Sequence, residues 1–376
     1  MIKKHKIHIA HLTSAHERNS SRIFYKMCLS CMKNNLKTSF IVSDGMGNDN
    51  YQGVNIYSVR KIKNRFARIL LTPFLILYKS LKTPAEIYHL HDPELIPIGL
   101  ILKLFRKKVI FDSHEDIPTQ MLAKPYLNKI SLKFISKLFC LFQRVSFPIF
   151  DGIITATPYI ENLLRKHNKN LICIANFPII ETSACSIFLP SINQSKAICY
   201  VGGISENRGI YEIIQALSLV NEEITLNLCG NFQNKELKEK LSAQLIWNRV
   251  NYLGFVDQQQ IKEVFKDSFA GIVTLHPIKN YQDSLPIKLF EYMNAGLPII
   301  ASNFNLWKSI IEEANDGLLV DPLNSKEIAN AIDFLYRNKE IASEMGFNGQ
   351  RKVHKKYNWN FEEKKLITFY RKIIDS

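Results

Sequence analysis

The chain alternates twice between strand-like and helix-like segments, and this alternation limits its possible folds more than any other feature. In the first half, short apolar runs alternate with longer segments in which apolar residues recur every three or four positions. Strands separated by helices form parallel sheets with helices on both faces. We expect strands at 7–13, 38–43, 87–91, 108–112 and 152–155, and helices at 21–34, 65–81, 95–105 and 127–150.

The second half repeats the pattern. We expect strands at 197–201, 224–229, 250–253 and 271–275, and helices at 210–219, 234–243, 258–265, 307–314, 325–338 and 361–374. Periodicity fails over 179–195, where Pro190, Ser191 and Asn193 suggest a linker. The chain has 376 residues, which is long for one core. We therefore predict an α/β protein of two doubly wound, Rossmann-like domains facing a cleft, at 1–180 and 196–358, joined by a linker at 181–195.

Cysteine usage and apolar run lengths indicate the compartment. The seven cysteines lie mostly in apolar runs, and the N-terminus reads as a strand rather than a leader, which fits a reducing cytoplasm. Cys28 and Cys31 form a C-x-x-C spacing without the second pair that a zinc site needs. The longest apolar runs, such as 70–78 and 95–102, are too short to span a bilayer. We expect a soluble or peripheral protein.

The positive charge is concentrated in the first half. Residues 1–180 hold 27 Lys and Arg against 11 Asp and Glu, whereas 181–376 hold 22 against 23. The basic residues gather in two amphipathic stretches, 60–82 and 124–144, which suit an anionic membrane surface. The alternative is two core helices with solvated basic faces. No nucleic-acid motif accompanies the charge, so we expect no nucleic-acid partner.

The stretch at 275–302 combines a strand end, a polar loop, a helix and a second strand. Pro286 suits the first turn of a helix, and Gly296 suits its end. Lys288 and Glu291 then lie on one helical face, near an N-terminus that attracts phosphate. The alternative is an ordinary surface ion pair.

Polar residues also follow other predicted strands. The turn GGISENRG places Gly202 and Gly203 after a strand and Arg208 before a helix, which suits either a phosphate or a plain structural turn. In the first half, the segments HLHDPE and FDSHED end neighbouring strands. Such clusters are typical of a site. No known metal spacing is completed, and buried hydrogen-bonded histidines are the commoner explanation for His89.

Taken together, these motifs resemble the retaining glycosyltransferases of family 4, which have the GT-B fold. The resemblance is closest to bacterial enzymes of surface-polysaccharide assembly (O-antigen or capsule type). It runs nearly end to end and is carried by HLTSAHERNSSRIFYK, HLHDPELIPIGL, FDSHEDIP, YVGGISENRGI and LPIKLFEYMNAGLPIIAS. It implies that 196–358 bind a nucleotide sugar, that 1–180 receive the acceptor, and that a last helix, 359–376, crosses back to the first domain.

The resemblance also implies donor-binding residues. Glu291 matches the carboxylate that holds the ribose, and Asp283 matches the catalytic carboxylate at the donor sugar, with Asp in place of the usual Glu. Arg208 matches one of two phosphate cations, while Gly203 stands where the other is expected and Lys288 is the candidate replacement. The predicted donor-binding residues are Gly202, Gly203, Arg208, Ser284, Leu285, Lys288 and Glu291.

In the first domain, His114 matches a catalytic-site histidine beside the anomeric carbon. The acceptor-side candidates are Ser14, Arg22, His91, Asp92 and Glu115. The resemblance implies no metal and no other cofactor. It predicts retaining transfer from a nucleotide-diphosphate sugar to a lipid-linked saccharide, by a cytoplasmic protein peripheral on the inner face of the membrane. The alternatives are a sugar-nucleotide epimerase of the same fold and a non-catalytic protein that binds sugar nucleotides or membranes.

Overall fold

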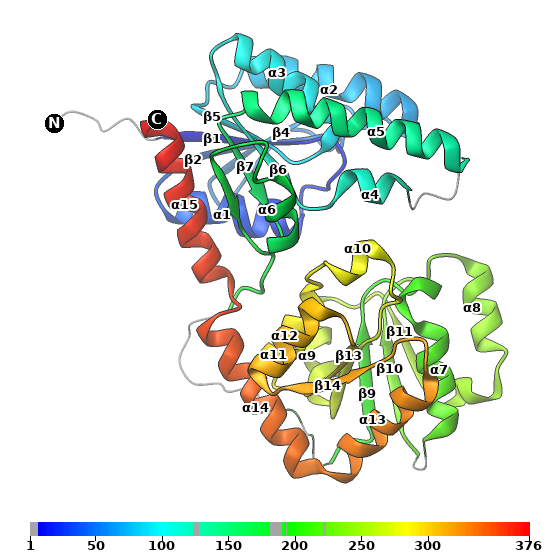
Figure 1. The fold of residues 1–376 in the computed structure, drawn as a ribbon. Helices are drawn as coiled ribbons and strands as arrows, with labels where there is room; N and C mark the ends of the chain where they lie inside the picture. The colour runs from blue at the N-terminus through cyan, green and yellow to red at the C-terminus, as the bar shows by residue number, and fades with distance from the viewer. Residues whose placement is uncertain (1–6, 123–127, 181–189, 191, 193, 221–222) are drawn as a thin grey trace. The chain divides into compact units, whose positions relative to one another are not determined.

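The computed structural model describes residues 7–122, 128–180, 190, 192, 194–220 and 223–376. The chain divides into two compact units (Figure 1). The first comprises Met1–Asn176 and Trp359–Ser376, and the second comprises Phe177–Asn358. Most of the predicted linker lies outside the described residues.

The first unit is built on a sheet whose strands run in the order β3-β4-β2-β1-β5-β6-β7-β8. All neighbours are parallel except β3, which pairs antiparallel with β4. The strands β3, β4 and β8 were not predicted, because they are short and partly exposed rather than apolar runs. The strands are β1 (His8–Thr13), β2 (Lys37–Val42), β3 (Asp49–Tyr51), β4 (Val54–Ser58), β5 (Ile87–Leu90), β6 (Lys108–Ser113), β7 (Gly152–Thr155) and β8 (Leu171–Cys173).

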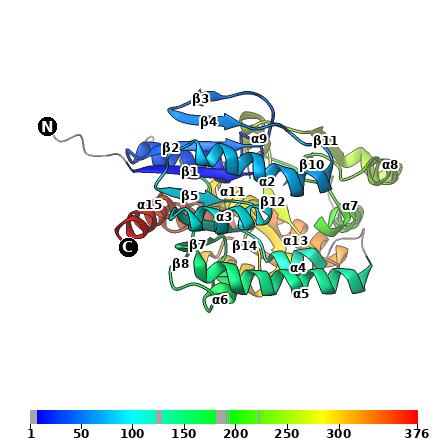
Figure 2. The same cartoon turned by 90° about the horizontal axis from the view of Figure 1, so that it is seen from above.

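Helices cover both faces of this sheet (Figures 1 and 2). The helices α2 and α3 pack on one face through residues such as Ile76 and Ile98, and α1 and α15 pack on the other through residues such as Cys31 and Leu366. The helical elements are η1 (Ser21–Cys28), α1 (Leu29–Lys33), α2 (Arg65–Leu81), η2 (Pro93–Leu95), α3 (Ile96–Leu104), α4 (Ile117–Leu122), α5 (Lys129–Ser146), η3 (Phe147–Ile149), α6 (Pro158–Leu164) and α15 (Trp359–Asp375).

The helix predicted over 21–34 is present, but it is not α-helical throughout. The segment begins as a π-helix, η1, and becomes an α-helix only at Leu29. Both Arg22 and Lys26 are buried in η1, and Lys26 Nζ donates to the Asn176 side chain at 2.6 Å. The spacing of apolar residues predicts which face of a helix is buried, and it does not predict that Arg22 and Lys26 are buried there. The sequence pattern therefore did not reveal the π-helical start.

The helix α15 completes the first unit. Its Tyr370 hydroxyl lies 2.8 Å from Nδ1 of His89 on β5, and its Trp359 indole donates to Ser30 at 2.8 Å. The Glu362 carboxylate accepts a hydrogen bond from the Ala175 amide at 2.8 Å. These contacts attach the last helix to the sheet and to α1.

The second unit has a fully parallel sheet in the order β11-β10-β9-β12-β13-β14. Both sheets are wound with helices on two faces, so the predicted fold class is confirmed. Neither β14 nor the polar helix α14 was predicted. The strands are β9 (Ala197–Val201), β10 (Thr225–Cys229), β11 (Val250–Gly254), β12 (Ala270–Val273), β13 (Ile299–Ser302) and β14 (Gly317–Val320).

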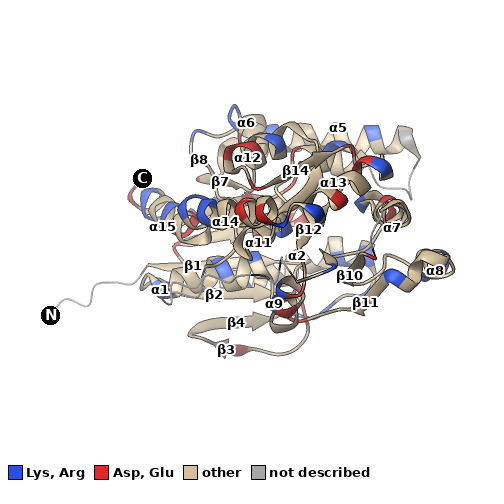
Figure 3. Ribbon diagram, turned by 90° about the horizontal axis from the view of Figure 1, so that it is seen from below, with Lys and Arg blue, Asp and Glu red and all other residues tan. Residues whose placement is uncertain are grey.

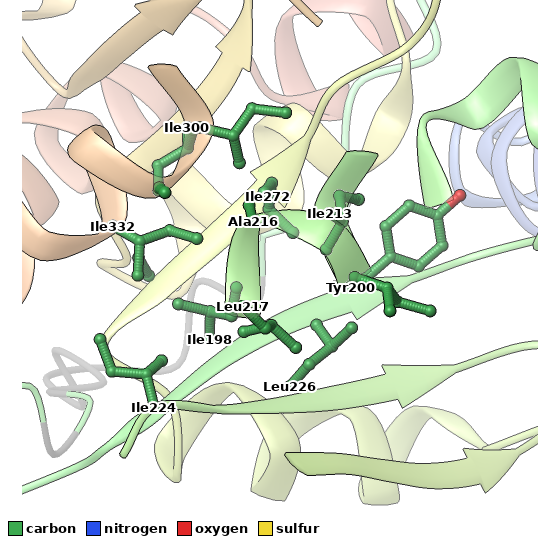
Figure 4. Packing of buried hydrophobic residues seen from close by; sticks show 14 of the residues in the cluster. Ile198, Tyr200, Ile213, Ala216, Leu217, Ile224, Leu226, Ile272, Ile300 and Ile332 are labelled. Atoms are coloured by element: carbon green, nitrogen blue, oxygen red, sulfur yellow. The ribbon is translucent and has the colours of Figure 1, made fainter. Parts of the chain in front are cut away.

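The core of this unit forms where Ile198 and Leu226 of the sheet meet Leu217 of α7 and Ile332 of α13 (Figure 4). Side-chain caps set the first turns of α8, α9 and α13, at Asn234, Asp257 and Asn324. The helical elements are η4 (Glu206–Arg208), α7 (Ile210–Leu219), α8 (Lys235–Ser242), η5 (Leu245–Arg249), α9 (Gln258–Lys266), α10 (Lys279–Gln282), α11 (Ile287–Asn294), α12 (Asn305–Ala314), α13 (Ser325–Arg337) and α14 (Lys339–Lys355). Within the described part of the chain, no helix combines the length and the apolar character needed to cross a bilayer.

A buried carboxyl group at the start of β14 gives a stability prediction. Asp316 is 0% exposed, neither carboxylate oxygen has a hydrogen-bond partner among the described residues, and burial raises its pKa to about 8. At pH 7 the unfolded carboxyl is ionised while the folded one stays protonated, which opposes folding by about 4 kcal/mol. Asp316→Asn should raise the free energy of unfolding at pH 7 by up to that amount.

The gain should shrink as the pH falls and disappear near pH 3, because the carboxyl is then mostly protonated in both states. Urea unfolding at the two pH values measures the difference. The matched control is Glu344→Gln, which changes an exposed carboxylate on α14 and should have no effect. An equal gain at both pH values would show that ionisation is not its cause.

Candidate functional site

In the second unit, the strand order reverses between β9 and β12. Sheets of this kind bind ligands at the carboxyl edge beside such a reversal, because the loops after the two strands diverge there. Gly202 and Gly203 follow β9, and the segment from Thr274 to Pro286 follows β12. The predicted donor-binding residues therefore gather around one strand edge of this unit.

Gly209 joins these two loops. It has φ 74°, and a Cβ built on it would lie 2.0 Å from the carbonyl oxygen of Thr274. Only glycine combines a positive φ with so close an approach. Gly209 is also the N-cap of α7, where no side chain accepts a hydrogen bond from the first turn. Among the described residues, the first amides of α7 therefore have no side-chain cap, as at anion-binding helix ends.

Two basic side chains lie beside the glycine pair. Arg208 Nη1 donates to the carbonyl oxygen of Gly203 at 3.3 Å. A Cβ built on Gly202 would lie 3.6 Å from both Arg208 Nη1 and Lys288 Nζ. The absence of side chains on the two glycines leaves bare backbone beside both basic side chains, which is suitable chemistry for a phosphate. We call Gly202, Gly203, Arg208 and Lys288 the cationic seat.

Lys288 is not the solvated surface residue that a plain ion pair with Glu291 requires. It is 7% exposed, its Nζ has no hydrogen-bond partner among the described residues, and it lies 3.7 Å from the centre of the Tyr200 ring. Burial, together with the Arg208 charge, lowers the pKa of Lys288 well below its usual value. The surface-pair alternative is wrong for this residue.

Tyr200 supports both basic side chains and was missed by the sequence analysis. Its ring belongs to the core of the second unit, and its hydroxyl points away from the aliphatic residues (Figure 4). The hydroxyl donates to the carbonyl oxygen of Gly203 at 2.7 Å. A tyrosine next to the last residue of a strand, two positions before a glycine pair, was the available signal.

The loop between α10 and α11 carries the other predicted donor-binding residues. Asp283 is half-buried at the end of α10, and Leu285 lies just before α11. Glu291 lies on α11, one turn after Lys288. The Ser284 amide already donates to the carbonyl oxygen of Tyr281 at 3.1 Å. The carbonyl oxygen of Ser284 in turn accepts from the Trp307 indole at 2.7 Å, so internal hydrogen bonds hold this loop.

In the first unit, Asp92 holds the loop after β1. Its Oδ2 accepts hydrogen bonds from the Thr13 hydroxyl at 2.7 Å and from the amides of Ser14 at 2.7 Å and Ala15 at 3.2 Å. Its Oδ1 lies 3.5 Å from His16 Nε2. Asp92 and Ser14 are 3% and 2% exposed. These two acceptor-side candidates thus fix a loop, and their polar atoms are largely engaged.

Arg22 and His91 belong to a buried network behind that loop. Arg22 forms a bidentate pair with Asp112 at 2.8 and 2.9 Å, and His91 Nδ1 lies 3.2 Å from Asp112 Oδ2. Burial alone would raise the pKa of Asp112, but Arg22 and His91 lower it well below its usual value. His91 Nε2 then lies 3.0 Å from His11 Nδ1.

The histidines of this network are neutral at pH 7, because burial lowers the pKa of His91 to about 4 and those of His11 and His89 well below the usual value. The three rings place one nitrogen each within 4.8 Å of the others, a spacing that metal ligands can have. His91 Nδ1 donates to Asp112, and His89 Nδ1 lies beside the Tyr370 hydroxyl. His11 Nδ1 and His91 Nε2 face each other, whereas His89 Nε2 has no hydrogen-bond partner among the described residues. The predicted buried, hydrogen-bonded role of His89 agrees with this network.

His114 lies at the end of β6 and is only half-buried. Its Nδ1 has no hydrogen-bond partner among the described residues, and its ring centre lies 5.4 Å from that of His16. Glu115 beside it is exposed. His16 was not singled out from the sequence, although it falls within the motif HLTSAHERNSSRIFYK. The structure therefore brings His16, His114 and Asp92 together at one edge of the first sheet.

Comparisons with known proteins give the class of this arrangement. A sucrose-phosphate synthase from Thermosynechococcus elongatus has TM-score 0.78 at 15% identity, covering 98% of this chain and 100% of that one. Anabaena HepE, solved in complex with UDP-glucose, has TM-score 0.71 at 14% identity, covering 97% and 100%. At these identities the likeness shows the fold, which is GT-B.

Residues 188–352 match the family described as glycosyl transferases group 1. Two uncharacterized glycosyltransferases of Methanocaldococcus jannaschii are 27% and 24% identical, over 48% and 73% of this chain and 45% and 69% of theirs. A capsular polysaccharide biosynthesis glycosyltransferase, CapM of Staphylococcus aureus, is 20% identical over 48% of this chain and 47% of its own. The chain thus spans about half the length of two of these three relatives. The chain is therefore similar to group 1 glycosyl transferases over residues 188–352, and its fold is GT-B.

The contact at Gly209 gives a prediction for this site. Gly209→Ala should lower the free energy of unfolding by more than about 2 kcal/mol, because it adds a backbone clash to an unfavourable positive φ. The matched control is Gly254→Ala, since Gly254 also has a positive φ, 67°, but nothing lies within 4 Å of its Cβ position. The control should lose only about 1 kcal/mol. Equal losses in urea unfolding would show that the Thr274 contact is unimportant.

Proposed function

We propose that this protein transfers a sugar from a nucleotide-diphosphate donor to a lipid-linked saccharide, with retention at the anomeric carbon, in bacterial surface-polysaccharide assembly. The observation that carries the proposal is the cationic seat: bare glycine backbone, two basic side chains and an uncapped helix start at the carboxyl edge of a Rossmann-like sheet. The fold, the family match and the names of the relatives support the same class of reaction.

In this proposal Glu291 binds the ribose hydroxyls, and Asp283 and Leu285 contact the donor sugar. The bond between the anomeric carbon and the phosphate oxygen breaks, and a bond from the same carbon to the acceptor oxygen forms. The acceptor proton passes to the leaving phosphate. The side chains Arg208 and Lys288 stabilise the charge that develops there, so we expect no metal requirement.

On the first unit, we propose that the half-buried His114 lies beside the reacting sugar and that exposed Glu115 contacts the acceptor. Of the other acceptor-side candidates, Ser14 and Asp92 would act by fixing the loop after β1, whereas Arg22 and His91 would act through the buried network around Asp112. They are therefore positioning residues in this proposal.

We further propose that the protein acts as a cytoplasmic enzyme bound to an anionic membrane through α2 and α5. These two helices expose many large apolar side chains: Phe66, Ile69, Leu70, Leu71, Phe74, Leu75, Tyr78 and Leu81 on α2, and Ile130, Phe134, Ile135, Leu138, Leu141 and Val145 on α5. Exposed cations accompany them, including Arg65 on α2 and Lys133, Lys137 and Arg144 on α5. Apolar and basic side chains on the same helices fit lipid tails and anionic headgroups together.

The charge distribution supports a membrane-facing first unit. Figure 3 shows Lys and Arg recurring along α5, whose sequence has no acidic residue, whereas acidic and basic residues mix on α12 and α13 of the second unit. Long-range attraction to anionic headgroups should therefore act mainly on the first unit, and it should weaken with salt.

Donor binding can be tested first. A thermal-shift screen with UDP, GDP, ADP and their sugars should raise the melting temperature with one nucleotide family, and Glu291→Ala should abolish that shift. The control Glu312→Ala changes an exposed carboxylate on α12 and should keep it. With the donor known, release of nucleoside diphosphate only in the presence of membrane lipid supports transfer. Sugar conversion without any acceptor would indicate an epimerase, and binding without turnover would indicate a non-catalytic protein.

Membrane binding can be tested by liposome flotation. Vesicles of phosphatidylglycerol and phosphatidylcholine should carry the protein at low salt, and vesicles of phosphatidylcholine alone should carry much less. The double variant Phe66→Ser, Phe134→Ser should float poorly. The control Phe255→Ser removes a similarly exposed phenylalanine from the second unit and should not matter. Flotation that ignores both lipid charge and the double variant would refute this surface.

A further inference from the structure

The Lys288 amine is a buried group with no acceptor. Its Nζ has no hydrogen-bond partner among the described residues. Below it lies the ring of Tyr200 at 3.7 Å, and beside it lies the Arg208 guanidinium, which shares the space in front of Gly202. The cationic seat therefore contains two basic side chains around one small space.

The groups around Lys288 decide its charge. From β9 it faces Tyr200 and Cys199, from η4 it faces Arg208, and from its own helix it is flanked by Glu291 and Tyr292. The Cys199 thiol gives no counter-charge, because burial raises its pKa to about 12.

Two of these neighbours favour the charged form of the Lys288 amine, but burial and the Arg208 charge have the larger effect. The Tyr200 face and the Glu291 carboxylate attract an ammonium, yet burial and the Arg208 charge outweigh them, and the net direction of the Lys288 pKa is down.

We propose that Lys288 is an uncharged amine in the empty protein and becomes an ammonium when a nucleoside diphosphate enters the cationic seat, so that donor binding takes up a proton. This inference rests on the proposed function of the same seat. The proton comes from the solvent and stays on Nζ while the diphosphate is bound.

The geometry explains why a diphosphate would drive this change. The bare backbone at Gly202 and Gly203 lets an anionic oxygen come close to both basic side chains. Such an oxygen would give Nζ the acceptor that it lacks, and it would offset the Arg208 charge that disfavours the ammonium. A lysine that is neutral until the ligand binds can occupy a buried position, where burying a permanent ammonium would cost free energy.

The experiment is calorimetric titration with UDP, GDP, ADP and inorganic pyrophosphate, near pH 7.5, in two buffers of different ionisation enthalpy. The difference in heat between buffers gives the protons taken up. We expect wild-type protein to take up close to one proton for each diphosphate bound. Lys288→Met should bind about 10- to 100-fold more weakly, the effect of losing one charge-assisted hydrogen bond, and should take up none. The control Lys262→Met, on the exposed side of α9, should behave as wild type.

The stability of the empty protein checks that Lys288→Met folds. Removing a buried amine without an acceptor should raise its melting temperature above that of the wild type. If the wild-type protein binds none of the nucleotides, the proposed function fails. If it binds and Lys288→Met binds equally well, the role of Lys288 in the seat is overturned. If the variant binds weakly but wild type takes up no proton, the protonation step is overturned.

Discussion

The close contact between Gly209 and the carbonyl oxygen of Thr274 holds together the two loops on which the second unit's candidate site depends. One loop follows β9 and carries Arg208, and the other follows β12 and leads to α11. Without this contact the start of α7 would not lie against the end of β12. Because parallel strands only align backbones, the placement of side chains at their ends requires such specific loop contacts.

The first unit differs from the second in that it buries charged side chains at the ends of its strands. The pair of Arg22 and Asp112 is buried, and it gives His91 a fixed partner. Removing one member of such a pair is costly, because the other charge is left buried alone. Polar residues massed at strand ends are therefore of two kinds here. Some are hydrogen-bonded to one another in the interior. Others, such as His114, have a ring nitrogen without a hydrogen-bond partner among the described residues, so that nitrogen can bind a ligand.

The sequence predicted the parts of the fold that repeat a local pattern. Apolar runs revealed the central strands, because strands buried on both faces carry no alternation. The edge strand β3 is polar and exposed, so no such pattern existed for it. The placement of Lys288 over Tyr200 could not be predicted, because it depends on how α11 packs against β9, residues that lie far apart in the sequence. Similarly, the inward turn of Arg22 depends on Asp112, ninety positions later.

The helix α15 places part of the first unit's interior at the far end of the chain. Tyr370 pairs with His89, and Phe369 fills the space beside Gly152 that a Cβ would occupy. During synthesis, the part of one sheet face that α15 covers therefore emerges exposed from the ribosome, and it stays exposed while the whole second unit is made. The second unit, whose residues Phe177–Asn358 are contiguous, can complete its core earlier. The first unit to be synthesised is thus the last to complete its fold. Until α15 is made, the incomplete face is exposed to aggregation and needs protection by other components of the cell.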